Sequence, residues 1–308
     1  MAKAASRSAL EHSRIVDPAG IIPDLSRPEF EAFRALILAR TGIALGPHKR
    51  ALLQVRLGTR LRALGLASFG NYRHLLVEQD PEGDELARLV NAVTTNKTEF
   101  YREARHFTYL AQQWVPEALE RAARDGQRII RIWSAGCSSG EEPYTIAMTL
   151  ADALPQAAGW SLRILASDIN TEVLSRATAG IYRFEDVRPI PRAVLRRHFL
   201  RGRGTQAGLV RIRPELRQLV RFRSINLIED GWPIETPFDL IFCRNVLIYF
   251  DRPTQQRVLE RLVECLKEGG RLVLGHSEGV HGMVSGLRPA GSTIYHKESH
   301  HAGDHPDR

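Results

Sequence analysis

Apolar residues recur at helical spacing in the first third of the chain. Ser26 and Glu29 have the spacing of a capping box and precede apolar residues at positions 30, 33, 36 and 37. Similar patterns predict a second helix over residues 48–64 and a third over residues 69–78. We therefore expect residues 24–92 to form a small all-helical domain.

After residue 107 the pattern changes to short apolar runs that alternate with amphipathic stretches. The runs are rich in β-branched or aromatic residues and predict strands at 129–134, 163–166, 238–243 and 271–274. The stretches between them predict helices at 143–154, 171–178 and 254–266. This alternation predicts a mainly parallel sheet, covered by helices on both faces, within an α/β domain over residues 107–297.

The alternation is interrupted near residue 199. Three glycines precede an alternating segment at 209–213, and this combination suits a small antiparallel hairpin inserted at about residues 197–216; the glycines are Gly202, Gly204 and Gly208. The segment 93–106 is expected to link the two domains. The polar ends, 1–23 and 298–308, are expected to be disordered. The tail histidines could bind a metal, but a solvated tail is favoured and no metal site is expected.

Basic residues are concentrated in two regions of the chain. Its 308 residues include 43 Lys and Arg against 35 Asp and Glu, a formal charge of +8. Residues 32–77 contain no acid and carry +8, residues 182–223 contain twelve arginines and carry +9, and the remainder carries −9. With 43% apolar residues the chain can bury a core, which excludes a wholly disordered protein. The charge predicts an acidic partner without identifying its class.

The cysteines and the hydropathy favour a cytoplasmic protein. Cys137, Cys243 and Cys265 are far apart in the sequence and odd in number, which argues against a disulfide framework. No apolar run approaches the roughly 20 residues that a membrane-spanning helix needs. The first residues also lack the apolar core of a secretory signal.

A glycine-containing turn follows the predicted strand at 129–134. Gly136 and Gly140 lie between this strand and the next helix, where glycine lets a ligand approach the backbone closely. The turn lacks the lysine of a phosphate-binding loop, and Glu141 and Glu142 would repel a phosphate. These carboxylates suit a ligand with a cationic part, or they only stabilise the helix dipole.

Asp168 lies just after the second predicted strand. An acid at the end of this strand usually accepts hydrogen bonds from ribose hydroxyls, and the alternative is an N-cap for the helix at 171–178. We favour the ribose role because the glycine turn precedes Asp168 in the right order. An adenosine site that avoids phosphates indicates S-adenosylmethionine as the ligand.

Five motifs then carry a specific resemblance to the bacterial chemotaxis receptor methyltransferases of the CheR type. They are NAVTTNKTEFYRE at 91–103, GEEPY at 140–144, LASDIN at 165–170, FCRNVLIYFD at 242–251 and GHSE at 275–278. The resemblance spans about residues 28–296. It implies an S-adenosylmethionine-dependent class I methyltransferase with a Rossmann-like, mainly parallel sheet, a small N-terminal all-helical domain and an inserted antiparallel β subdomain.

The resemblance also implies which residues bind the cofactor. These are Asn96, Thr98 and Arg102 in the linker, Glu142 with Glu141 as the near alternative, Asp168 at the ribose, Asn226 and Leu227 beside the adenine, and Arg244 and Asn245 near the methionine part. Two of them have simpler alternatives from the sequence alone. Asn226 could cap a turn, and Arg244 could pair with an acid.

The implied reaction is methyl transfer to glutamate side chains in the cytoplasmic helical bundle of a chemoreceptor. The products would be glutamate methyl esters and S-adenosylhomocysteine. A carboxylate with a pKa of about 4.3 is already ionised at neutral pH, so the acceptor needs no general base. The resemblance assigns catalytic roles to Arg102 and Tyr249; the alternatives are a linker salt bridge and a core aromatic.

Two regions are expected to contact the receptor. Lys49, Arg56 and Arg60 fall within about 40° of one another on the predicted second helix, and no nearby acid is expected to offset them. We expect this face to dock an acidic helical bundle. The resemblance implies that the β subdomain binds a C-terminal receptor peptide by strand addition. A monomer is the default oligomeric state.

Two competing functions remain at this stage. A nucleic-acid methyltransferase could use the same arginines for phosphate contacts. However, Asn245-Val-Leu-Ile stands where base-flipping amino methylases carry Asn-Pro-Pro-Tyr or Asp-Pro-Pro-Tyr. A non-catalytic sensor of S-adenosylmethionine would need neither Arg102 nor Tyr249. We therefore expect neither a nucleic-acid partner nor membrane insertion.

Overall fold

A computed structural model describes residues 22–155, 159–280 and 282–298, which divide into two compact units between Thr95 and Asn96. The predicted disordered ends lie outside the described residues, apart from residues 22, 23 and 298. The predicted linker is divided, because residues 93–95 belong to the first unit and residues 96–106 to the second. Among the described residues, no helix is both long and apolar enough to cross a membrane.

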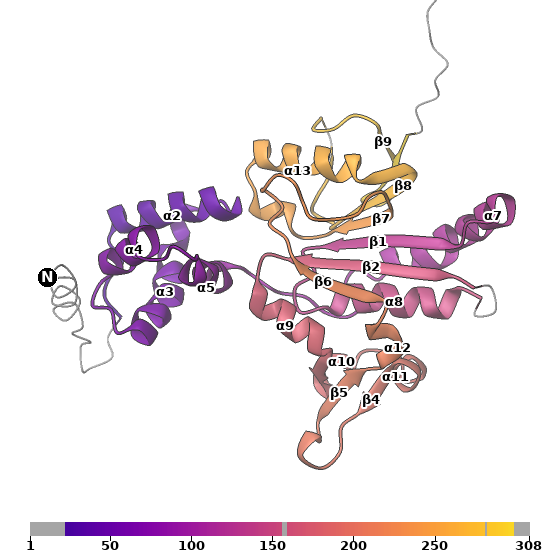
Figure 1. Ribbon diagram of the computed structural model, residues 1–308, viewed down its shortest axis with the longest axis horizontal. Helices are drawn as coiled ribbons and strands as arrows, with labels where there is room; N and C mark the ends of the chain where they lie inside the picture. Colours follow the sequence, from indigo (N-terminus) through magenta and orange to yellow (C-terminus); the bar gives the residue numbers. More distant parts are fainter. Residues whose placement is uncertain (1–21, 156–158, 281, 299–308) are drawn as a thin grey trace, which may run out of the picture. The chain divides into compact units, whose positions relative to one another are not determined.

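The first unit is all-helical. Its elements are α2 (Arg27–Thr41), the 3-10 turn η1 (Pro47–Lys49), α3 (Arg50–Leu64), α4 (Phe69–Glu78) and α5 (Asp84–Val93) (Figure 1). The capping box predicted at the start of α2 is present, since Ser26 and Glu29 each bond the other's backbone N–H. Phe33 contacts Phe69 edge-on and stacks on Tyr72 in the buried core. This unit therefore has a core of its own.

The second unit contains a seven-stranded sheet in the order β6-β2-β1-β7-β8-β10-β9 (Figure 1). The strands are β1 (Ile129–Ala135), β2 (Ser161–Asp168), β6 (Val220–Ser224), β7 (Phe238–Cys243), β8 (Leu266–Leu274), β9 (Leu287–Gly291) and β10 (Ile294–Lys297). The first five strands in the spatial order are parallel, and β10 is antiparallel to both of its neighbours. Strands β6, β9 and β10 were not predicted.

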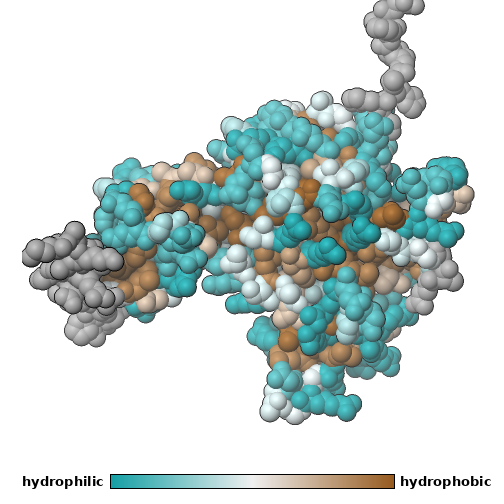
Figure 2. Space-filling model, viewed as in Figure 1, coloured by the Kyte–Doolittle hydropathy of each residue, from teal (hydrophilic) through white to brown (hydrophobic). Residues whose placement is uncertain are grey.

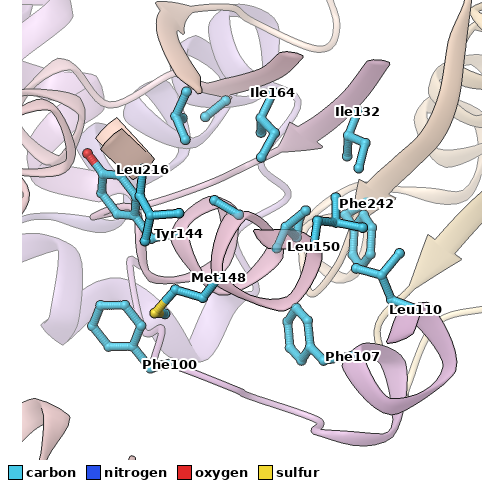
Figure 3. Packing of buried hydrophobic residues seen from close by; sticks show 14 of the residues in the cluster. Phe100, Phe107, Leu110, Ile132, Tyr144, Met148, Leu150, Ile164, Leu216 and Phe242 are labelled. Carbon is cyan, nitrogen blue, oxygen red and sulfur yellow. The ribbon is translucent and has the colours of Figure 1, made fainter. Parts of the chain in front are cut away.

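Helices cover both faces of this sheet, as the alternating sequence predicts. The helical segments are α6 (Arg105–Tyr109), the π-helical turn η2 (Leu110–Trp114), α7 (Val115–Asp125), α8 (Glu141–Ala153), α9 (Thr171–Ala179) and α13 (Arg252–Glu264). Alternate residues of β1 enter different cores: Ile132 packs in the cluster that includes α8, and Trp133 in the cluster that includes α13. Figure 3 shows Met148 and Leu150 of α8 within the first cluster.

The predicted hairpin is part of a larger insert. Strands β4 (Phe199–Arg201) and β5 (Leu209–Ile212) form the hairpin, and β3 (Ile181–Arg183) adds a third antiparallel strand in the order β3-β5-β4. The short helices are α10 (Phe184–Val187), α11 (Arg192–His198), the 3-10 turn η4 (Gly204–Gln206) and α12 (Pro214–Arg217). The subdomain thus begins before the predicted residue 197, because β3 precedes the hairpin in the sequence.

Candidate cofactor and methyl-transfer site

The glycine turn lies at the carboxyl ends of β1 and β2. Gly136 and Cys137 donate their backbone N–H groups to the Ser167 carbonyl oxygen at 2.7 and 2.8 Å. Gly136 has φ 80°, and a Cβ there would lie 2.3 Å from a Val246 methyl group. Glycine is therefore required by both the backbone conformation and the close packing.

Asp168 is buried beside this turn. Its carboxylate accepts hydrogen bonds from the backbone N–H groups of Ser138 at 2.8 Å and Asn170 at 2.9 Å. Burial raises its pKa, while these hydrogen bonds oppose the rise. The N-cap of α9 is Asn170, so the capping alternative for Asp168 is wrong. Asp168 is instead fixed at the end of β2 by backbone groups of the glycine turn and of residue 170.

The two glutamates after the turn have different surroundings. Glu142 accepts a hydrogen bond from Ser134 Oγ at 2.7 Å and pairs with Arg244 Nη1 at 3.1 Å. Glu141 accepts from the nearby Ser139 Oγ at 2.8 and 3.0 Å. Burial raises the pKa of both carboxyl groups. Only Glu142 is thereby linked to strand β1 and to the residue that follows β7.

Arg244 is the buried centre of an ion-pair network. Its Nη2 lies 3.0 Å from Glu103 Oε2 and also donates to the Arg102 carbonyl oxygen, while its guanidinium lies 5.4 Å from the centre of the Phe107 ring. Together with the Glu142 contact, this gives Arg244 two acidic partners, as the sequence alternative predicted, and leaves its expected cofactor contact untested. The pairing fixes the guanidinium at the carboxyl end of β7.

Glu103 was not predicted as a site residue. It pairs with Arg244 and accepts from Asn245 Nδ2 at 3.3 Å, and its own backbone has φ 56°. Although burial by itself raises its pKa, the Arg244 charge and the hydrogen bonds hold it below its usual value. The sequence did offer a signal for a role of Glu103, because this residue follows Arg102 and ends the motif at 91–103.

Two histidines lie near Glu103. Possible ligand atoms of Glu103, His106 and His276 lie within 4.8 Å of one another. Arg244 already occupies the Glu103 oxygen that faces both rings, and its positive charge disfavours a cation there. Burial and the Arg244 charge lower the pKa of His106 to about 4, so this ring is neutral at neutral pH. Glu103 therefore belongs to the ion pair with Arg244, and the two histidines lie beside that pair.

The linker residues pack along the glycine turn and α8. The Asn96 carbonyl oxygen accepts from Ser138 Oγ at 3.1 Å, and the Tyr101 N–H donates to Thr145 Oγ1 at 3.3 Å. Thr98 is half-buried. Arg102 is also half-buried, and its Nη1 donates to the Lys97 carbonyl oxygen at 2.8 Å. This contact is to the backbone, whereas the alternative for Arg102 was a salt bridge within the linker.

The proposed adenine-binding segment follows β6. Asn226 donates from Nδ2 to Glu229 at 3.0 Å and accepts from the Ile228 N–H at 3.3 Å. This arrangement is the turn cap considered as the alternative for Asn226. Leu227 is buried in the core that includes α13. The segment is therefore rigidly held at the same edge of the sheet as Asp168.

Tyr249 ends the 3-10 turn η5 (Leu247–Tyr249), which follows Arg244 and Asn245. Tyr249 is half-buried, unlike its exposed neighbour Ile248. It lies outside the residues that make up the buried core clusters, although Phe250 packs against one of them. The tyrosine ring is thus less enclosed than a core aromatic would be.

The basic side chains of η1 and α3 that were expected to dock the receptor are partly engaged within the helical unit. Lys49 is exposed, but Arg56 donates to the carbonyl oxygens of Val93 and Thr94 at the end of α5. Arg60 makes two hydrogen bonds to Glu85, at 2.6 and 2.9 Å. The expectation that no acid offsets these charges is therefore wrong for Arg60, because the fold brings Glu85 of α5 to it.

The fold and this site together define a class of enzyme. Parallel strands carry a glycine turn and the buried Asp168 at their carboxyl ends, and the Glu142–Arg244 ion pair lies at the same edge. These features fit S-adenosylmethionine, whose sulfonium is cationic and which lacks phosphates. The molecule is an S-adenosylmethionine-dependent class I methyltransferase with an N-terminal helical domain.

Comparison with known families identifies the particular family. Residues 96–296 match the CheR methyltransferase, SAM binding domain, and residues 28–94 match the CheR methyltransferase, all-alpha domain. The chain belongs to the CheR methyltransferase family. The sequence prediction of family, fold class and cofactor is confirmed, and a nucleic-acid methyltransferase is not favoured.

Several curated relatives are similar over most of their length. The chemotaxis protein methyltransferase of Klebsiella aerogenes is 47% identical over 271 residues, which cover 88% of this chain and 90% of that protein. The Escherichia coli chemotaxis protein methyltransferase is 46% identical, with 88% and 91% covered. Chemotaxis protein methyltransferase 2 of Pseudomonas aeruginosa is 45% identical, with 88% and 93% covered.

Proposed function

We propose that this enzyme methylates glutamate side chains of chemoreceptors and so takes part in sensory adaptation. The observation that carries the proposal is the ion-pair network of Glu142, the buried Arg244 and Glu103, at the same sheet edge as Asp168, in a chain that belongs to the CheR methyltransferase family. The acceptor is the cytoplasmic helical bundle of the receptor. The products are a glutamate methyl ester and S-adenosylhomocysteine, and the enzyme acts in the cytoplasm as a monomer.

Each residue at this edge has a proposed part in holding the cofactor. Asp168 accepts hydrogen bonds from the ribose hydroxyls, and Asn226 and Leu227 border the adenine. Arg244 and Asn245 bind the methionine part, with Glu142 close to its cationic groups. Asn96, Thr98 and Arg102 close the pocket from the linker, which the Asn96 contact to Ser138 supports.

When bound, S-adenosylmethionine supplies a methyl group made electrophilic by the sulfonium. The residues of this chain have to orient the acceptor carboxylate and exclude water. Arg102 holds one oxygen of the carboxylate by charge-assisted hydrogen bonds while the other oxygen faces the methyl carbon. Tyr249 offers a hydroxyl at the same edge. No proton has to be removed from an ionised carboxylate.

Receptor docking is proposed for the basic face of η1 and α3. Lys49, Arg56 and Arg60 were predicted for this role, and Lys49 retains the exposure that it requires. Arg56 and Arg60 contribute less free charge because both have partners within the helical unit. An acidic helical bundle would be attracted to the face, and added salt would weaken the attraction.

A second contact is proposed at the antiparallel subdomain. The order β3-β5-β4 leaves β3 and β4 at the two edges, where a receptor C-terminal peptide could add a strand. Exposed apolar residues accompany both edges, namely Ile181 on β3 and Leu200 on β4. Figure 2 shows apolar surface among hydrophilic residues in this part of the second unit.

Transfer of a tritiated methyl group to receptor-containing membranes tests the proposed function. The expected result is label in the receptor that is released as methanol by base, because esters are base-labile. A receptor whose methylated glutamates are replaced by alanine serves as the control. Label in nucleic acid, or base-stable label in protein, would contradict the proposal.

A further inference from the structure

Glu278, the last residue of the GHSE motif, is a buried carboxylate bound by backbone groups. It accepts hydrogen bonds from four backbone N–H groups: those of Gly275 and Asn245 at 2.7 Å, Val246 at 2.9 Å and Ile248 at 3.3 Å. Its exposed fraction is 9%. Three of the donors belong to the loop after β7, so one side chain organises that loop from a different segment of the chain.

The organised loop runs from residue 245 to residue 249. Asn245 has φ 60°, a left-handed conformation that costs a non-glycine residue of order 1 kcal/mol. Carbonyl groups are held as well, because Gln255 Nε2 donates to the Leu247 oxygen within the loop at 2.9 Å and to the Phe250 oxygen just after it at 3.1 Å. Glu278 thus binds N–H groups of this short loop, and Gln255 binds carbonyl groups at its end.

The contact between Glu278 and this loop depends on Gly275. A Cβ at Gly275 would lie 2.8 Å from Glu278 Oε2 and 2.9 Å from the Asn245 backbone nitrogen. These distances are shorter than real Cβ contacts, so any side chain there would displace the loop or the carboxylate. The glycine and the glutamate of GHSE therefore serve the same contact.

The loop also reaches the glycine turn. Val246 lies so close to Gly136 that a Cβ on the glycine would meet its methyl group at 2.3 Å. A shift of the loop would consequently move Asn245 and Tyr249 and disturb the packing against the cofactor turn. Displacements of about 1 Å in a site can cost roughly 100-fold in rate.

We propose that Glu278 is a positioning residue for methyl transfer, which sets the places of Asn245 and Tyr249 by binding the backbone of their loop. This inference rests on the proposed roles of those two residues. Glu278 acts through the loop and does not touch the acceptor. Both of its oxygens are needed, since Oε2 binds Gly275 and Asn245 and Oε1 binds Val246 and Ile248.

The test is Glu278→Gln in the full-length enzyme. Glutamine keeps the volume but replaces one acceptor oxygen with an NH₂ group that faces N–H donors. We expect kcat for receptor methylation to fall about 10- to 100-fold, with the receptor KM changed less than about threefold. Glu278→Asp, which keeps the carboxylate, should recover part of the loss.

Asp239→Asn is the matched control. Asp239 is also a carboxylate that accepts a backbone N–H, that of Arg131 at 2.8 Å, and it pairs with Lys267 at 2.8 Å, but it lies near the amino end of β7. This variant measures how much the loss of a backbone-binding carboxylate lowers the stability of the protein when that carboxylate is remote from the site. If Glu278→Gln lowers kcat no more than Asp239→Asn at equal folded fraction, measured by thermal unfolding, the inference is overturned.

A double-mutant cycle with Tyr249→Phe separates the inference from the roles on which it rests. If Glu278 acts through Tyr249, Glu278→Gln should have a clearly smaller fold-effect on kcat in the Tyr249→Phe background. Fully additive effects would overturn the action through Tyr249. If Tyr249→Phe alone leaves kcat unchanged, the role of Tyr249 fails by itself. Titration with S-adenosylhomocysteine then tests whether Glu278 positions Asn245 for cofactor binding. Binding at least fivefold weaker in Glu278→Gln than in wild type supports this positioning, and unchanged binding overturns it.

Discussion

Glu103 Oε2 lies 3.0 Å from Arg244 Nη2, an ion pair that joins the segment before α6 to the end of β7. The two residues are 141 positions apart in the sequence. Both side chains are largely buried, so the pair is poorly screened by solvent. The pair fixes the guanidinium that we assign to the methionine part of the cofactor.

Glu103→Gln should weaken binding of S-adenosylhomocysteine about tenfold. The substitution removes the carboxylate that orients Arg244 and leaves a buried charge with one fewer partner. Isothermal titration calorimetry measures the change. Glu117→Gln is the control, because Glu117 pairs with Arg271, away from this network. Equal affinities in the Glu103 variant and wild type would show that the pair does not orient the binding group.

Arg102→Ala should lower turnover more than it weakens cofactor binding. Its guanidinium is proposed to hold the acceptor carboxylate, and such catalytic contributions are typically about 10²-fold or more. Arg105→Ala, at an exposed position of α6, is the matched control and should behave as wild type. Steady-state methylation with saturating cofactor gives kcat. Unchanged turnover of Arg102→Ala would exclude the proposed role.

Arg60→Ala should destabilise the helical unit by about 2–3 kcal/mol. The substitution leaves Glu85 buried with Tyr72 as its remaining side-chain partner, at 2.8 Å. Urea unfolding of the full chain measures the effect. Arg62→Ala, at an exposed position of the same helix, should change stability by less than about 0.5 kcal/mol. Equal stabilities would mean that the ion pair contributes nothing net.

Lys49→Glu should raise the receptor KM with little change in kcat. Lys49 is exposed on the face proposed to meet an acidic bundle, and reversal of its charge turns attraction into repulsion. The increase should shrink as salt is added. Arg124→Glu reverses an exposed charge on α7 in the other unit and serves as control. A KM equal to that of wild type at low salt would refute docking through Lys49.

Stability should fall in acid partly because of His106. Burial and the Arg244 charge lower its folded-state pKa to about 4, below the unfolded value of about 6.5. A depressed pKa stabilises the folded state above the unfolded value, and this contribution is lost as pH falls from about 6.5 to 4. Urea unfolding at pH 7.5 and 4.5 should show a smaller acid loss in His106→Gln than in wild type. His74→Gln, at an exposed position, should keep the wild-type loss; equal losses in all three proteins would contradict the assignment.

The sequence by itself determined the local elements and the motif order. The capping box of α2, the alternation of strands and helices and the glycine turn all follow from short-range patterns, because they depend on residues a few positions apart. The same patterns did not predict β6, β9 and β10. They also placed the start of β8 at residue 271, whereas the strand begins at Leu266 and includes Gly269 and Gly270, which interrupt the apolar pattern.

Only the tertiary structure decided which charges are free and which are paired. Arg60 looked uncompensated because Glu85 lies 25 positions away, and Glu103 had no assigned role because Arg244 lies 141 positions away. Glu278 likewise binds donors about 30 residues earlier. Such pairings depend on how helices and strands pack, which a linear pattern does not encode. The sequence thus identified the family and its chemistry, and the packing decided which side chains hold the site in place.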